Sequence, residues 1–197
     1  FGNGDGTFNP GLTVEEDDDP VQLGDFDGDG ILDLVTHNRG DKELTIRLGN
    51  GDGTFSIRQR LGGHPLNTTG IKIADLDGDG HQDLLAVEVL DRRIVVRLGN
   101  GDGTFGSQKR LNVGDRPWGV ALGDLNDDGT LDLAIRGDSI ITFFGDGDGT
   151  FSDKNTYAVS SFYGGITLGD FDADGVLDAA AGADLDIAIL LGDGDGT

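Results

Sequence analysis

The stretch DFDGDGILD at residues 25–33 holds four aspartates and two glycines in nine positions. Three further stretches keep the same pattern: DLDGDGHQD from Asp75, DLNDDGTLD from Asp124 and DFDADGVLD from Asp170. Self-similarity at a nearly fixed spacing marks a repeat protein, and these starting points give a repeat of about 48 residues. The aspartate stretch therefore sets the organisation of the chain.

A glycine-rich phrase recurs with the same spacing. LGNGDGTF at 48–55 returns unchanged at 98–105, and FGDGDGTF occupies 144–151. Related copies stand at both ends, at 1–8 and 191–197. Because this phrase occurs five times and the aspartate stretch four times, we expect the chain to be a segment of a larger array.

Apolar residues alternate with polar ones between these motifs. In the second repeat Ile71 and Ile73 share one face before the aspartate stretch, and Ile94, Val96 and Leu98 share one face after it. A period of two predicts half-buried strands, and no segment keeps the helical period because glycine interrupts each candidate. Each repeat is therefore predicted to form four strands, with the aspartate stretch between the first two and the glycine phrase between the last two.

A repeated four-stranded antiparallel meander of this length is typical of β-propeller blades. We predict an all-β fold in which residues 1–197 form a single propeller segment of a larger propeller or array. The approximate repeats are 2–48, 49–98, 99–144 and 145–191, with 192–197 beginning a further repeat.

The composition limits the classes of partner. The formal net charge is −23, from 14 Lys plus Arg against 37 Asp plus Glu. Such a charge opposes binding to nucleic acid or to anionic lipid, and it favours cations or basic proteins. The 36% hydrophobic residues can form a core, and no apolar stretch approaches the ~20 residues that a membrane helix needs. No membrane insertion is expected in this segment.

The aspartate stretch predicts a calcium site. Side chains at positions 1, 3, 5 and 9 and the carbonyl of position 7 can converge on one ion, and the glycine at position 6 permits the turn. Hard oxygen ligands in a flexible loop suit Ca²⁺ better than Mg²⁺. The predicted ligands are Asp25, Asp27, Asp29, Ile31 and Asp33; Asp75, Asp77, Asp79, His81 and Asp83; Asp124, Asn126, Asp128, Thr130 and Asp132; and Asp170, Asp172, Asp174, Val176 and Asp178.

The alternative is that these stretches are ordinary aspartate-rich turns, since Asp and Gly favour turns. Four nearby carboxylates repel one another by about 1 kcal/mol per pair even in water, which argues for a bound cation. We expect about four structural Ca²⁺ ions, one per repeat. The third site should be the weakest because Asn126 replaces an aspartate, and Ala173 departs from the glycine or aspartate of the other loops.

The other acidic stretches receive a different interpretation. The glycine phrase offers only one or two carboxylates per copy, so we interpret it as a tight turn whose phenylalanine anchors between blades. The run EEDDD at 15–19 is interpreted as a solvated loop.

The aspartate loop after a short apolar strand, followed by LGNGDGTF, resembles the FG-GAP or VCBS repeat, which forms the blades of integrin α-subunit propellers. The resemblance spans the whole chain. It implies Ca²⁺ between the first two strands of each blade and commonly seven blades in a ring. Integrin-like propellers bind protein partners on the face opposite the aspartate loops, which is formed by the loops between the second and third strands and between blades. Fungal lectins resembling this fold bind sugars between blades.

Two features lie in that opposite set of loops. Arg-Gly-Asp, the motif that integrins read in their ligands, occurs at 39–41 and 136–138, and we interpret both copies as turns. Trp118, the single tryptophan, could stack on a sugar ring, but we expect it to pack under a loop.

Catalysis is not expected. His37, His64 and His81 fall at unrelated positions of the repeat, and the chain has no cysteine. Because millimolar extracellular calcium would saturate even weak sites, we expect an extracellular or cell-surface setting. The predicted function is adhesion or structural protein–protein assembly, with neighbouring blades or chains as partners; the alternative is a carbohydrate-binding lectin.

Overall fold

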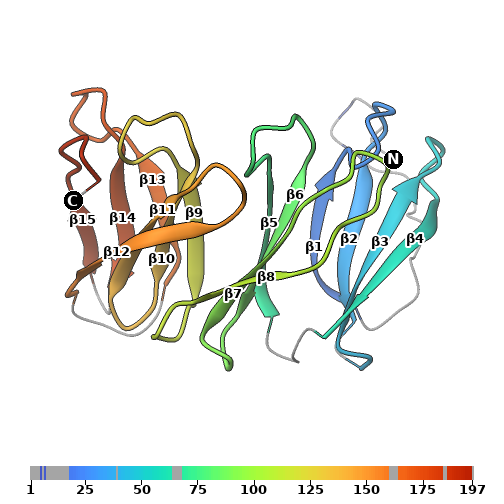
Figure 1. The fold of residues 1–197 in the computed structure, drawn as a ribbon, viewed down its shortest axis with the longest axis horizontal. Helices are drawn as coiled ribbons and strands as arrows, with labels where there is room; N and C mark the ends of the chain where they lie inside the picture. Colours follow the sequence, from blue (N-terminus) through green and yellow to red (C-terminus); the bar gives the residue numbers. More distant parts are fainter. Residues whose placement is uncertain are drawn as a thin grey trace.

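The computed structural model describes Asp5, Thr7 and residues 18–38, 40–63, 68–159, 164–183 and 186–196. These residues form fifteen strands in four sheets, which stand side by side in sequence order (Figure 1). The strands are β1 (Asp18–Gly24), β2 (Asp33–Asn38), β3 (Glu43–Gly49), β4 (Phe55–Gly62), β5 (Thr68–Ala74), β6 (Asp83–Glu88), β7 (Arg93–Arg97), β8 (Lys109–Asn112), β9 (Gly119–Gly123), β10 (Asp132–Arg136), β11 (Ile140–Gly145), β12 (Phe151–Tyr157), β13 (Ile166–Gly169), β14 (Asp178–Ala183) and β15 (Asp186–Leu190).

Each sheet is an antiparallel meander in which consecutive strands are neighbours. The first three sheets, β1–β4, β5–β8 and β9–β12, have four strands each. The described part of the fourth sheet, β13–β15, has three. The predicted fourth strand of a repeat follows its glycine phrase, and no described residue follows Gly196 in the last phrase. The predicted all-β class is thus confirmed, and three sheets have the four strands predicted for a blade.

The sheets are arranged as blades of a propeller. The first strands of neighbouring sheets touch: β1 contacts β5, β5 contacts β9, and β9 contacts β13. The first strand of each sheet therefore lies nearest a common axis, and the fourth strand lies at the outer edge (Figure 1). None of the described residues forms a helix that could span a membrane.

The sheets are offset from the sequence repeats by one strand. The sheets span 18–62, 68–112, 119–157 and 166–190, whereas the repeats of the sequence were divided before each glycine phrase. The fourth strand of each sheet therefore follows a glycine phrase and belongs to the next repeat of the sequence division. The interpretation of 15–19 as a loop was wrong at Asp18 and Asp19, because β1 begins at Asp18, which pairs with Asn38 of β2. Residues 15–17 lie outside the described part of the chain.

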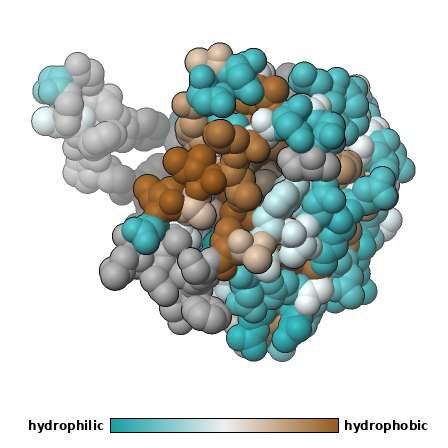
Figure 2. Space-filling model, turned by 90° about the vertical axis from the view of Figure 1, so that its left-hand side faces the viewer, coloured by the Kyte–Doolittle hydropathy of each residue, from teal (hydrophilic) through white to brown (hydrophobic). Residues whose placement is uncertain are grey.

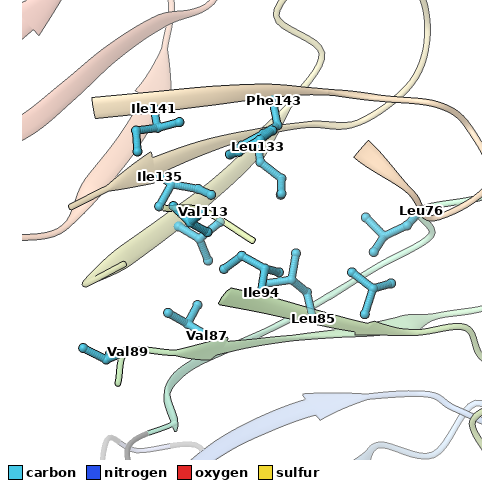
Figure 3. Close-up of a cluster of buried hydrophobic side chains, with 12 residues drawn as sticks. Leu76, Leu85, Val87, Val89, Ile94, Val113, Leu133, Ile135, Ile141 and Phe143 are labelled. Carbon is cyan, nitrogen blue, oxygen red and sulfur yellow. The ribbon is translucent and has the colours of Figure 1, made fainter. Parts of the chain in front are cut away.

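The core consists of layers between neighbouring sheets. All six residues of β2 and of β6 are buried. β6 belongs to the second sheet, which lies between the first and third sheets (Figure 1). Figure 3 shows the layer between the second and third sheets, where Leu85, Val87 and Ile94 meet residues such as Leu133 and Ile135. Alternate side chains of such a strand point to opposite faces of the sheet. One strand with a period of two therefore packs on two neighbouring sheets.

Candidate metal centre

The ninth aspartate of each loop opens the second strand and is buried. In the first loop, Asp33 Oδ2 accepts a hydrogen bond from the backbone N–H of Phe26 at 2.7 Å, and Oδ1 accepts one from Gly49 at 2.9 Å. This carboxylate therefore joins the start of the loop to the end of β3. The same two bonds recur in the other sheets: Asp83 with Leu76 and Gly99, Asp132 with Leu125 and Gly145, and Asp178 with Phe171 and Gly192.

The glycine that ends the third strand is required by close contact with this loop. A Cβ at Gly49 would lie 2.4 Å from the carbonyl oxygen of Leu32, a distance that no side chain tolerates. Sequence reasoning missed both this contact and the anchoring role of the ninth aspartate. The available signal was the first glycine of the phrase, which is the same in every copy. The corresponding contacts are Gly99 with Gln82 at 2.3 Å, Gly145 with Leu131 at 2.4 Å and Gly192 with Leu177 at 2.4 Å.

Aspartates from three of the four loops converge. In each group, oxygens of the three carboxylates lie within 4.8 Å of one another. The third loop, all of which is described, forms no such group of three acidic residues; there Asn126 Nδ2 donates a hydrogen bond to Asp128 Oδ2 at 2.9 Å. The groups are Asp25, Asp27 and Asp29; Asp75, Asp77 and Asp83; and Asp170, Asp172 and Asp178.

Backbone hydrogen bonds fold each loop around its first aspartate. Asp25 accepts from the N–H groups of Gly28 and Gly30 at 2.9 and 3.0 Å. Asp29, the fifth position, accepts from the N–H of Ile31 at 2.7 Å, and the same bond recurs at His81, Thr130 and Val176. The seventh residue is thus fixed beside the fifth. Its carbonyl as a metal ligand stays a prediction.

The fourth and sixth positions of the loop have positive φ. Gly28 and Gly30 adopt φ of 75° and 83°, which glycine tolerates. At the fourth position of the third and fourth loops, Asp127 and Ala173 adopt φ of 58° and 66°. Aspartate visits this region at moderate cost, whereas alanine is strained there.

Burial and repulsion raise the pKa of the ninth aspartate in three of the loops. Removal from water raises the pKa of Asp33, Asp83 and Asp132; repulsion from acidic neighbours such as Asp27 and Asp29 adds to the rise, and the two backbone hydrogen bonds oppose it. No ion pair in the described part of the chain joins a Lys or Arg to a carboxylate of these four loops. Within the described part of the chain, no basic side chain thus balances the negative charge of these clusters, and backbone N–H groups are the donors that face it. Each carboxylate oxygen that accepts one N–H retains a second lone pair for a cation.

The glycine phrase is a hydrogen-bonded turn, as interpreted from the sequence. Asp52 Oδ1 accepts hydrogen bonds from the backbone N–H of Thr54 at 2.9 Å and from its hydroxyl at 2.6 Å. The hydroxyl bond chiefly lowers the pKa of Asp52. The same pair of bonds forms at Asp102 with Thr104 and at Asp148 with Thr150. These three aspartates shape turns, and none of them belongs to a group of three converging carboxylates among the described residues.

The phenylalanine of the glycine phrase at 98–105 anchors between blades, which confirms the prediction at this position. Phe105 is buried among residues of the first and second sheets, and its ring meets Phe26 edge to face at 5.5 Å. Gln59 of β4 accepts from the Phe105 N–H at 2.7 Å and donates to its carbonyl at 3.1 Å. Arg58 pairs with Asp102 at 3.0 Å across the same boundary. The phrase therefore joins one blade to the previous one.

The Arg-Gly-Asp sequence at 136–138 is a turn that does not present its arginine. Arg136 is 1% exposed, and Asp115 accepts hydrogen bonds from the backbone N–H groups of Asp138 and Ser139 at 3.0 and 3.3 Å. Trp118 is 39% exposed, and its backbone N–H donates to the Arg136 carbonyl at 2.7 Å. In the copy at 39–41, Arg39 lies outside the described residues.

Comparison with known proteins agrees with this architecture. The model of the FG-GAP-like repeat matches residues 25–86 and 75–135, which together make up more than half of the chain. No curated protein sequence matches.

Solved structures share the fold. A structure of an Agrocybe aegerita lectin that recognises non-reducing terminal N-acetylglucosamine is 26% identical, with a TM-score of 0.62 over 89% of this chain and 49% of the lectin chain. The Photorhabdus luminescens Tc holotoxin pore is 19% identical, with a TM-score of 0.53 over 86% of this chain and 9% of the toxin chain. The chain thus spans about half the length of the lectin and a small part of the toxin. On the repeat match, the protein belongs to the FG-GAP-like repeat family.

Proposed function

We propose that this chain is a non-catalytic binding module whose propeller blades are stabilised by calcium in the aspartate loops. One observation carries the proposal: carboxylates converge in three of the four loops, and no described Lys or Arg forms an ion pair with them. Such an arrangement is costly in the absence of a cation and favourable in its presence. The donor set consists of oxygens alone, which fits Ca²⁺.

The calcium would be structural. The loop lies between the first two strands and, through its ninth aspartate, is bonded to the end of the third strand. An ion held there stabilises the connection of three strands, and a ligand that binds only the folded state raises stability by mass action. The third loop would bind most weakly because it contributes an amide, Asn126, in place of a carboxylate.

The setting proposed is extracellular or at the cell surface, where calcium is abundant enough to saturate sites of modest affinity. In that setting the module would serve adhesion or structural assembly with other proteins. Meander topology places the loops between second and third strands on the end of the molecule opposite the aspartate loops. Their sequences differ among the blades, as expected for a recognition surface.

The absence of catalysis remains part of the proposal. His37 is fully buried, and His81 lies in an aspartate loop with its backbone bonded to Asp79. The acidic residues that could serve as paired acid and base are the proposed calcium ligands.

A direct test is to count the calcium ions. Equilibrium dialysis followed by elemental analysis should give three to four Ca²⁺ per chain. Asp77→Asn should lower this number or the affinity at one site, and the matched variant Asp102→Asn, in a glycine phrase, should leave both unchanged. Binding of no calcium at millimolar concentration would overturn the proposal.

Glycan binding is a second candidate, favoured by the 26% identity with the Agrocybe aegerita lectin. A cleft of about 370 Å³, including its open mouth, lies between the aspartate loops of the second and third sheets. Asp77, Gly78 and Thr130 are among the residues that line it, and their polar groups could bind the hydroxyl groups of a sugar.

Titration with N-acetylglucosamine tests this candidate at two places. Gly78 has φ of 74° and open space around its Cβ position, so Gly78→Asn keeps the loop and obstructs the cleft. This variant should lose sugar binding, and Trp118→Ala should retain it. The reverse pattern would place the sugar at the opposite end, and failure to bind any glycan on a broad array would exclude the lectin function.

A further inference from the structure

The first aspartate loop contacts the neighbouring blade through Phe26. This residue is the second position of the loop, between Asp25 and Asp27, and its side chain is 4% exposed. Its ring packs in the core between the first and second sheets, edge to face with Phe105 at 5.5 Å. The residue between two proposed calcium ligands is therefore also part of the boundary between two blades.

The backbone of Phe26 is held from both sides. Its N–H donates to Oδ2 of Asp33, the ninth aspartate of the same loop, at 2.7 Å. Its carbonyl accepts a hydrogen bond from the N–H of Gly103, in the glycine phrase of the second sheet, at 2.9 Å. Gly103 is buried, so this bond is shielded from water. One residue thus links a carboxylate of the loop to the backbone of the next blade.

A glycine before the loop makes room for the ring. A Cβ at Gly24 would lie 2.5 Å from Cε1 of Phe26 and 2.2 Å from Oε1 of Gln82, which belongs to the aspartate loop of the second sheet. Two loops and the ring therefore meet at Gly24. The second repeat has Ala74 at the place of Gly24 and Leu76 at the place of Phe26.

The boundary between the second and third sheets lacks this link. Leu76 packs in the core there, and its N–H donates to Asp83 at 2.7 Å. Gly149 is the counterpart of Gly103, but within the described chain no backbone hydrogen bond joins it to Leu76. Leucine also has no ring to pair with Phe151, the counterpart of Phe105. The two boundaries thus differ in how directly the aspartate loop contacts the next blade.

Apolar contact alone fixes the position of a sheet less well than such a link. Figure 2 shows an apolar sheet face at the end formed by the fourth sheet, where hydrophobic side chains gather at the surface. The hydrophobic effect between such faces has no direction, whereas a hydrogen bond and an edge-to-face pair of rings have preferred geometries. The contacts of Phe26 therefore set the position of the first blade relative to the second.

We propose that Phe26 couples the first aspartate loop to the second blade, so that an ion in the loop also orders the boundary between the two blades. Without an ion, Asp25, Asp27 and Asp29 repel one another, and the backbone that carries Phe26 between them is less firmly held. The inference rests on the proposed function, in which the loops bind calcium, and adds a coupling between one loop and the adjacent blade.

Amide hydrogen exchange followed by NMR tests the coupling. The N–H of Gly103 should exchange at least about fivefold more slowly in calcium than in EDTA, since coupled sites commonly affect each other by this factor or more. Asp27→Asn, in the first loop, should remove most of this protection, and the matched variant Asp77→Asn, in the second loop, should leave it. Equal loss in both variants, or no effect of calcium on the parent, would overturn the proposal.

Because coupling between sites is reciprocal, a change in the second blade should alter calcium binding in the first. Phe105→Leu removes the pair of rings, so the calcium affinity of the first loop, followed at the Gly28 amide, should fall about fivefold. The affinity of the second loop, followed at Gly78, should not change. Phe151→Leu, the matched control, should leave the first loop as in the parent. An unchanged first loop in folded Phe105→Leu would contradict the coupling.

The exchange measurement leaves the core intact, so it decides the question even if Phe105→Leu does not fold. It also separates the inference from the proposed function. If calcium shifts the Gly28 signal but leaves the exchange of Gly103 unchanged, only the coupling is overturned. If calcium binds to none of the loops, the proposed function is overturned and the coupling with it.

Discussion

The aspartate loop and the glycine phrase look alike in sequence, yet the structure gives their carboxylates opposite roles. In the loop DLDGDGHQD, Asp75 and Asp77 converge with buried Asp83. In the phrase NGDGTF, Asp102 is satisfied by the backbone and hydroxyl of Thr104 and stays exposed. Spacing and burial, rather than acidic composition, therefore decide whether a turn can hold a cation.

The largest expected effect is loss of the anchoring carboxylate in the loop. Asp83→Ala leaves the buried N–H of Leu76 and the partly buried N–H of Gly99 without acceptors, and an unsatisfied buried group costs about 1–3 kcal/mol. We expect the free energy of unfolding to fall by about 3–5 kcal/mol in urea titrations, allowing for the cavity. Asp102→Ala, in the phrase, should have a much smaller effect. Equal effects of the two changes would remove the distinction between the motifs.

The next effect concerns the glycine where the two motifs meet. A Cβ at Gly99 would lie 2.3 Å from the carbonyl oxygen of Gln82, so Gly99→Ala must displace β7 or the loop. We expect a loss of about 2–4 kcal/mol by thermal unfolding, as for other strained or overpacked sites.

Gly62→Ala is its matched control, because Gly62 has no positive φ and no heavy atom within 4 Å of its Cβ position. The control should melt within about 2 °C of the parent. A Gly99→Ala protein as stable as this control would contradict the close contact of strand and loop.

A smaller change, Asp77→Asn, should raise the melting temperature in EDTA and lower it in calcium. In EDTA it removes repulsion within the cluster of Asp75, Asp77 and Asp83, so the melting temperature should rise slightly. In calcium it removes a ligand charge, so the melting temperature should fall and the affinity of that site should drop about tenfold. A shift of the same sign in both conditions would mean that Asp77 does not face a cation.

The smallest effect is relief of strain in the fourth loop. Ala173 adopts φ of 66°, where the first two loops have glycine. Ala173→Gly should stabilise the protein by about 0.5–1 kcal/mol, since the left-handed conformation costs alanine about 1–2 kcal/mol and glycine adds unfolded-state entropy. The control Ala180→Gly, in β14 with ordinary φ, should lower the melting temperature.

The sequence was sufficient for the architecture because the evidence for it is local and repeated. Alternation predicts strands such as β6 and β7, and the recurrence of the aspartate stretch predicts their order in each blade. The register of Asp25, Asp27 and Asp29 likewise predicts which carboxylates share a loop. Because the chain carries four copies of the aspartate stretch, the same pattern supports the predicted strand order at four places.

What the sequence did not predict depends on contacts between distant residues. Asp83 and Gly99 are 16 positions apart, and only the fold shows that one accepts a hydrogen bond from the other. Asp18 pairs in β1 against its own low strand propensity, because tertiary pairing overrides composition.

The most direct test of calcium-dependent folding is thermal unfolding of the chain in calcium, in EDTA and in EDTA with excess Mg²⁺. A site saturated at a hundred times its dissociation constant adds about 2.7 kcal/mol, so each occupied loop should raise the melting temperature by about 5–10 °C. We expect a large rise in the melting temperature in calcium and little rise in magnesium. An identical melting temperature in all three conditions would contradict it.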